Sequence, residues 1–161
     1  MKEQVAKRQL ECYKEYIQLL EVTKTVINEC NGKSFSKRIT KKIGQKAEEI
    51  GLDFYVYQGD ITADKHVSVG VINRNRCVDN YYLTDYQFGL YIHFSEGKYI
   101  NSEKTIEGIN TRIESQKENI RKFEHTLEHY EEYKGMKEYL KKLIDTQNKE
   151  VHHLFEELKI R

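Results

Sequence analysis

The sequence predicts an α+β protein, in which long helices pack against a small antiparallel sheet. Two periodicities carry this prediction. Over residues 1–31, 35–50 and 101–161, apolar residues recur at steps of three and four, the spacing of one helix face. Over residues 52–100, apolar and polar residues alternate, which is the spacing of half-buried strands. The connections between the alternating runs are too short for helical crossovers, so we expect three or four antiparallel strands.

The composition fits one domain covering residues 1–161. The chain has 161 residues, 33% of them charged, and a net charge of only +1. Its mean hydropathy of −0.80 is typical of long helices with a narrow apolar stripe and much solvated surface. Because the net charge is close to zero, any charge-driven binding has to come from a local patch.

The three cysteines are odd in number and lack C-x-x-C spacing. The sequence therefore predicts neither a disulfide framework nor a zinc ribbon, and it favours a reducing compartment. The N-terminus lacks the apolar run of a signal peptide, and no stretch reaches the ~18 apolar residues of a membrane span. We expect a cytoplasmic protein without a membrane anchor.

The first helix is expected over residues 1–31, with Val5, Cys12, Leu19 and Val26 recurring every seven residues. Asn31-Gly32 supplies the residues that tolerate the left-handed conformation at a helix C-terminus. The stripe is wide enough to contact two neighbours. We expect this helix to pack antiparallel against part of the last one, since both need cover.

The second helix is expected over residues 35–50, with Ser34 or Ser36 as its N-cap and a buried stripe that includes Ile50. This region and the sheet loops carry a run of basic residues, namely Lys33, Lys37, Arg38, Lys41, Lys42, Lys46, Arg74 and Arg76. One interpretation is a solvated face neutralised by a neighbouring helix. The other is a docking surface for phosphate or for an acidic partner.

The sheet is expected to be apolar on the face toward the helices and aromatic on the other face. Tyr55, Tyr57 and Tyr91 fall at the outward positions of their runs. An aromatic outer face on a small sheet is either an edge of the core or a contact surface. On the second interpretation these three residues are candidates for partner binding. A further short strand is expected at Tyr81-Tyr82-Leu83.

The last helix is expected over residues 101–161 and begins at Asn101 or Ser102. Its apolar residues form a heptad seam, which consists of Ile106, Ile109, Ile113, Ile120, Phe123, Leu127 and Tyr130. After Tyr130 the seam positions are lysines, and the apolar stripe moves back by one residue to Met136, Leu140 and Leu143. Together with Gly135, this shift predicts a break near residue 135 and a coiled-coil-like segment that needs cover. Either the helix folds back near Gly135, or a second copy of the chain supplies the partner helix.

One catalytic motif occurs in this helix. His125, Glu128 and His129 have the H-x-x-E-H spacing of the inverted zincin peptidases, in which two histidines bind zinc and the glutamate activates water. The resemblance stops at these five residues, and both histidines lie on the outer side of the seam. We therefore predict neither a metal nor a cofactor, and we keep a zinc hydrolase as the weakest of three hypotheses.

The first hypothesis is a non-enzymatic regulatory protein that acts through protein–protein contacts and forms a homodimer through its helices. Its size, its composition and its lack of catalytic signatures fit an inhibitor encoded by a phage or mobile element, of the anti-defence or anti-CRISPR kind. No motif links it to such a family. The second hypothesis is a nucleic-acid-binding accessory protein that uses the basic residues of 33–46.

Overall fold

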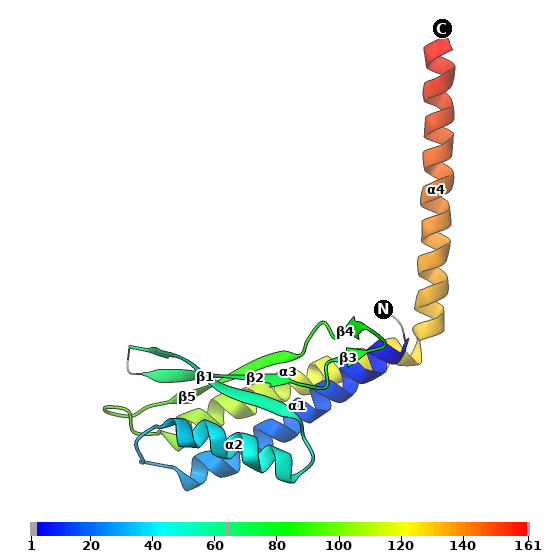
Figure 1. The fold of residues 1–161 in the computed structure, drawn as a ribbon. Helices are drawn as coiled ribbons and strands as arrows, with labels where there is room; N and C mark the ends of the chain where they lie inside the picture. Colours follow the sequence, from blue (N-terminus) through cyan, green and yellow to red (C-terminus); the bar gives the residue numbers. More distant parts are fainter. Residues whose placement is uncertain (1–2, 64, 161) are drawn as a thin grey trace. The chain divides into compact units, whose positions relative to one another are not determined.

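The computed structural model describes residues 3–63 and 65–160 and confirms the α+β fold (Figure 1). The elements in chain order are α1 (Glu3–Glu29), α2 (Lys37–Glu49), β1 (Phe54–Thr62), β2 (His66–Asn73), β3 (Cys77–Val78), β4 (Tyr81–Tyr82), β5 (Gln87–His93), α3 (Ser102–Glu128) and α4 (Tyr130–Ile160). Residues 1 and 2 of the first expected helix, and residue 161 of the last, lie outside the described part of the chain.

The chain divides into two compact units, Met1–Glu124 and His125–Arg161, and the single domain expected from the sequence stays a prediction. The division follows from where the buried apolar side chains lie. All members of the two hydrophobic clusters belong to the first unit. The second unit holds the last turn of α3 together with α4, whose exposed large apolar side chains are Met136, Tyr139, Leu140, Leu143 and Ile144.

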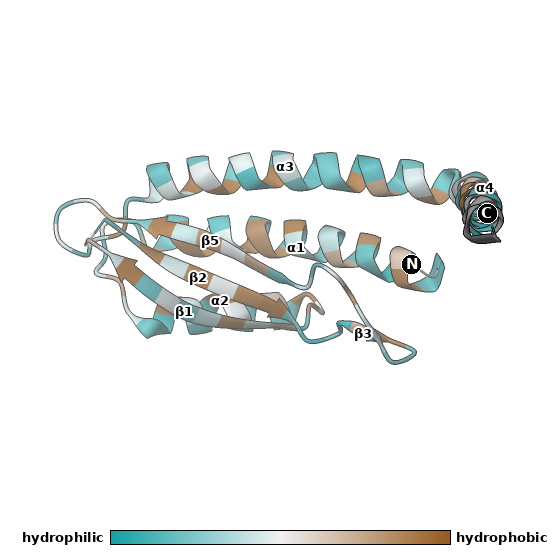
Figure 2. Cartoon of the chain, turned by 90° about the horizontal axis from the view of Figure 1, so that it is seen from above, coloured by the Kyte–Doolittle hydropathy of each residue, from teal (hydrophilic) through white to brown (hydrophobic). Residues whose placement is uncertain are grey.

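The main sheet has the strand order β1-β2-β5, and both pairings are antiparallel. Val56 lies opposite Val71 in the first pair, and Val69 lies opposite Leu90 in the second. The alternation predicted from the sequence is therefore realised: valines of β2 are buried, and the residues between them are only half-buried. The inward face packs on α1 and α2, which lie together on one side of the sheet (Figure 2).

The expected fourth strand takes a different place. β4 pairs with β3 as a separate two-stranded hairpin, with Cys77 opposite Tyr82. Asp79 and Asn80 form its turn with φ angles of 47° and 67°. Positive φ at both central positions is the conformation that closes a two-residue hairpin, and Asp and Asn tolerate it.

α3 lies beside α1 and runs antiparallel to it, as the two apolar stripes predicted (Figure 2). The rings of Tyr13 and Phe123 are 5.3 Å apart at one end, and Lys24 Nζ donates to Asn110 Oδ1 at 3.0 Å toward the other. The helices also cover the outer edge of β5. The Tyr16 hydroxyl donates to Gly89 O at 2.6 Å, and His93 N donates to Thr105 Oγ1 at 2.9 Å, so helix side chains bind two main-chain groups of β5.

Local signals place the ends of α1 and α2. Gly32 and Gly51 have φ angles of 72° and 83°, and each closes the helix before it. Ser36 occupies the N-cap position of α2, with an extended backbone and no side-chain cap bond. The expected burial of Ile50 is wrong: this residue is the C-cap of α2, where the chain turns away, and its side chain is exposed.

The break in the last helix also differs from the prediction. Asn101 caps α3 as expected, with its Oδ1 accepting from Lys104 N at 3.1 Å. The helix is then interrupted at His129, and Gly135 lies within α4. A single glycine costs a helix only about 1 kcal/mol relative to alanine, which does not break it. The acidic pair Glu131-Glu132 falls in the first turn of α4, where negative charge favours a helix start.

Candidate functional site

The outward face of the main sheet carries the three tyrosines chosen from the sequence. Tyr55 and Tyr57 of β1 are 50% and 38% exposed, and Tyr91 of β5 is 45% exposed. The rings of Tyr55 and Tyr57 stack at 5.7 Å. Successive residues of a strand point to opposite faces. Phe54 is buried, so Tyr55, the next residue, points to the outward face, as does Tyr57 two residues further on.

Glycines form the floor between the tyrosines. Gly70 of β2 and Gly89 of β5 face each other directly in the ladder. A Cβ at Gly70 would lie 2.2 Å from a ring carbon of Tyr57, so the Tyr57 ring lies over this glycine. A Cβ at Gly59 would likewise meet Ser68 Oγ at 2.2 Å. A residue larger than glycine at position 70 would displace the Tyr57 ring.

This glycine floor opens as a hollow of about 300 Å³. Tyr57, Ser68 and Tyr91 line it, and Arg112 reaches it from α3. The Arg112 guanidinium carbon lies 5.5 Å from the centroid of the Tyr91 ring, which is cation–π geometry. Arg112 also acts on the hydroxyl of Tyr16: burial raises the pKa of Tyr16, and Arg112 opposes that rise.

A second hollow of about 300 Å³ also has Tyr57 in its lining. It is formed by Lys37 and Thr40 of α2 together with residues 55–58 of β1. β1 is an edge strand of the sheet, so this hollow lies along the outer edge of the sheet. Tyr57 lines both hollows, which makes it the central residue of the surface.

The predicted basic residues do not form one surface. Lys42 Nζ donates to Glu29 Oε2 at 2.6 Å, and this contact lowers the pKa of Glu29. Lys46 Nζ lies 4.0 Å from a carboxylate oxygen of Glu49. For these two lysines the structure favours the neutralised-face interpretation, because their charges are offset by carboxylates on α1 and α2.

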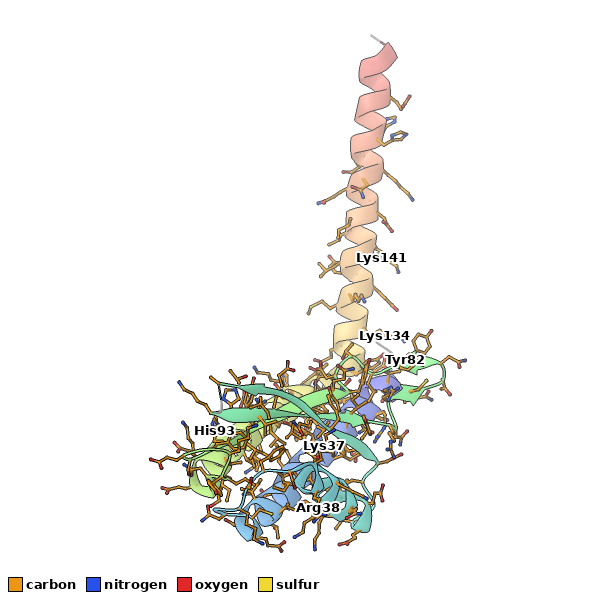
Figure 3. All side chains as sticks on the ribbon, turned by 60° about the vertical axis from the view of Figure 1, so that its left-hand side comes forward. Lys37, Arg38, Tyr82, His93, Lys134 and Lys141 are labelled. Carbon is orange, nitrogen blue, oxygen red and sulfur yellow. The ribbon has the colours of Figure 1, made fainter. Side chains whose placement is uncertain are left out.

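The remaining basic residues have separate environments. Arg74 pairs with Asp53 at 3.5 Å and lies 5.7 Å from the Tyr55 ring centroid, so it joins the tyrosine surface. Arg76 lies over Tyr86, 5.3 Å from its ring centroid. Of the predicted basic residues, Lys33, Lys37, Arg38 and Lys41 are exposed, and no ion pair is found for them within the described chain. Figure 3 shows Lys37 and Arg38 extending from α2.

The motif residues His125, Glu128 and His129 do come together. One potential ligand atom from each lies within 4.8 Å of the others, and the two imidazole centroids are 4.6 Å apart. His125 and Glu128 are exposed and His129 is half-buried. Two exposed residues and one half-buried residue within the short stretch 125–129 do not enclose a substrate.

Cys12 differs from a catalytic thiol in its surroundings. It is fully buried, and burial raises its pKa to about 11. Its sulfur accepts from Asn73 Nδ2 at 3.2 Å. Since a nucleophilic cysteine needs a lowered pKa, the environment of Cys12 is that of a structural residue.

Arg112 is the residue that the sequence did not indicate. It flanks the seam residue Ile113, and nothing in its local pattern distinguishes it from other charged residues of the helix. Its role depends on α3 lying against β5, which is a tertiary contact.

No helix of the described residues is long and apolar enough to cross a membrane. Comparisons with family models, curated proteins and solved structures find no match to this chain.

Proposed function

We propose that this chain is a non-enzymatic binding protein that holds a protein partner against the outward face of its β1-β2-β5 sheet. The observation that carries the proposal is the tyrosine surface, defined as Tyr55, Tyr57 and Tyr91 with Arg74 and Arg112. Tyrosine and arginine are the residues over-represented among the dominant contacts of protein interfaces. The two hollows beside Tyr57 are places where a partner's side chains can be buried.

The same features support a regulatory role over a chemical one. A chain that acts by covering a partner's surface needs a preformed, rigid contact area and no reactive group. Tyr57 is held over Gly70, and Tyr91 is held between His66 and Arg112. In this role the protein is a small regulator or inhibitor of the kind that phages and mobile elements encode.

The experiment is a pull-down with the tagged chain from its native host, followed by affinity measurement with the partner recovered. Tyr57→Ala should weaken binding by about 30-fold or more, because central aromatic contacts dominate such interfaces. Tyr82→Ala is the matched control: Tyr82 is 66% exposed but belongs to the β3-β4 hairpin (Figure 3). Equal affinities of the two variants would contradict the proposal.

A second candidate function is binding of single-stranded nucleic acid. It is favoured by the same tyrosines, because bases stack on exposed aromatic rings, and by Lys37 beside Tyr57. Fluorescence anisotropy with RNA and DNA oligonucleotides tests it. This function predicts binding that weakens steeply with added salt and is lost when Lys37, Arg38, Lys41 and Lys42 are changed to Glu. Absence of binding at low salt would eliminate it.

The proposal also includes a homodimer through α4, because this helix exposes Met136, Leu140, Leu143 and Ile144. The charges of α4 favour an antiparallel pair. Residues 134–142 hold four lysines and one glutamate, whereas residues 145–156 hold three acidic residues and one lysine. Lys134 and Lys141 are labelled in Figure 3. An antiparallel second copy places the basic half against the acidic half, and a parallel copy would place lysines together.

A further inference from the structure

The histidine cluster at the end of α3 has more order than a chance pair of surface side chains. His125 and His129 are four residues apart, so their side chains lie on one face of the chain, and Glu128 lies beside them. Within the described residues, these three form the only group of His, Cys, Asp or Glu donors close enough together to hold a metal ion. The main-chain bond from His129 N to His125 O, at 3.2 Å, keeps the helical spacing where the helix is interrupted.

A fourth residue orients one of the imidazoles. His129 Nδ1 lies 3.0 Å from Glu132 Oε2. When the carboxylate accepts the proton on Nδ1, Nε2 becomes the ring nitrogen that carries the lone pair. Histidine ligands of metal sites are held in this way: one ring nitrogen donates to a carboxylate, and the other binds the ion.

We propose that His125, Glu128 and His129 bind one divalent transition-metal ion of the Zn²⁺, Ni²⁺ or Cu²⁺ class, with Glu132 as the residue that positions His129. Imidazole nitrogens suit these ions, whereas Mg²⁺ and Ca²⁺ require oxygen ligands. Donor atoms around tetrahedral zinc are about 3.3 Å apart, given bonds of about 2.0 Å. The donors here lie within 4.8 Å, and rotation of the exposed His125 and Glu128 side chains would close the difference.

The role of this site is structural and independent of the tyrosine surface. His125 belongs to the last turn of α3, and His129 is the residue at which the helix is interrupted. An ion bound to both histidines would hold the last turn of α3 and His129 together and limit the backbone conformations of residues 125–129. The site has no enclosed cleft, so the proposal contains no hydrolytic step.

Isothermal titration of the full chain with Zn²⁺, Ni²⁺ and Cu²⁺ tests the proposal. We expect saturation at one ion per chain, and loss of that binding in His125→Ala and in His129→Ala. His152→Ala is the matched control, because it removes an exposed histidine of α4 outside the cluster and should leave the binding unchanged. Circular dichroism of each variant confirms that the helices remain.

Two further measurements separate a built site from loose histidine binding. Glu132→Gln should weaken the affinity by about 10-fold or more, as loss of a carboxylate behind a histidine ligand does. Electron paramagnetic resonance of the Cu²⁺ form should show two coordinated imidazole nitrogens. The proposal would be overturned if none of the three ions showed saturable binding. It would also be overturned if His129→Ala and His152→Ala bound the ion with equal affinity.

Discussion

Helices α3 and α4 are of similar length, 27 and 31 residues, and both carry apolar residues at helical spacing, yet their surroundings differ. In α3, Ile109 and Ile113 are 1% and 4% exposed, because α1 and the sheet cover them. In α4, Leu140 and Ile144 are 50% and 56% exposed. The same periodicity therefore marks a stripe that contributes to a core in one helix and a stripe open to solvent in the other.

The comparison teaches that a heptad pattern specifies a need for cover but not what provides it. α3 is covered because α1 has a wide stripe and runs antiparallel beside it, with Tyr13 against Phe123. Most of the stability of a helix in a protein comes from packing of its apolar face, so the exposed stripe of α4 leaves that contribution unused. Under the homodimer proposal, that support comes from a second copy of the chain.

The largest effect that tests this comparison is on stability. Leu20 of α1 is fully buried, so Leu20→Ala should lower the free energy of unfolding by about 2–5 kcal/mol through lost burial and a residual cavity. The same substitution at the exposed Leu140 should cost less than about 0.5 kcal/mol in dilute solution. Urea unfolding at low protein concentration measures both. Similar costs for the two variants would show that α4 is covered within its own chain.

The next effect is on self-association. Leu140→Lys combined with Ile144→Lys should weaken the dimer by about 100-fold or more, because each buried aliphatic side chain contributes about 1.5–3 kcal/mol. Glu138→Lys is the control, since it also raises the charge by two but at an exposed position on the opposite side of α4. Sedimentation velocity over a range of concentrations measures the dimer. A wild-type chain that stays monomeric throughout would refute the homodimer.

A charge exchange sharpens the same test by reporting orientation. Changing Lys134, Lys137 and Lys141 to Glu should weaken an antiparallel dimer, because both halves of α4 then carry negative charge. Adding Asp145→Lys, Glu150→Lys and Glu156→Lys should restore it by exchanging the two halves. A parallel dimer would not be weakened by the first change, because residues 134–142 would go from a net charge of +3 to −3 and would face the same charge on the second copy in both cases.

Where the sequence predicted the structure, the signal was local. Gly32 and Gly51 end their helices because their own backbone conformation requires it, and alternation places Tyr55 and Tyr57 whatever lies nearby. The sequence pattern did not predict the interruption at His129. Gly135 is tolerated inside α4, whereas the acidic pair Glu131-Glu132 falls in its first turn. The pairing of β4 with β3 was missed because alternation identifies a strand but not its neighbour.

The candidate site could be predicted only in part for the same reason. The tyrosines follow from strand periodicity, but the hollow between them requires Gly70 and Gly89 to be paired across two strands. Arg112 reaches that hollow only because α3 packs beside β5. The sequence shows which residues are basic, but the neutralisation of Lys42 by Glu29 depends on how α1 and α2 are packed.

The smallest effect concerns pH and the first unit alone. The pKa of His93 is lowered, first by burial and then by the nearby charges of Lys104 and His66. His93 lies at the end of β5, where its backbone N donates to Thr105 Oγ1 of α3 at 2.9 Å. The folded state therefore favours the neutral imidazole more than the unfolded state does.

The direction of the pH effect follows from this difference. Above the unfolded pKa of about 6.5, His93 is neutral in both states and contributes no pH dependence. As the pH falls below that value, the unfolded state takes up the proton first, so stability declines until the pH reaches the lower folded pKa. Urea unfolding of the wild type at pH 7.5 and 5.5 should show this decline, and His93→Gln should lose less stability over the same interval. Equal losses would mean that protonation of His93 does not oppose the packing of α3 against β5, and that the pH response of this unit arises at other groups.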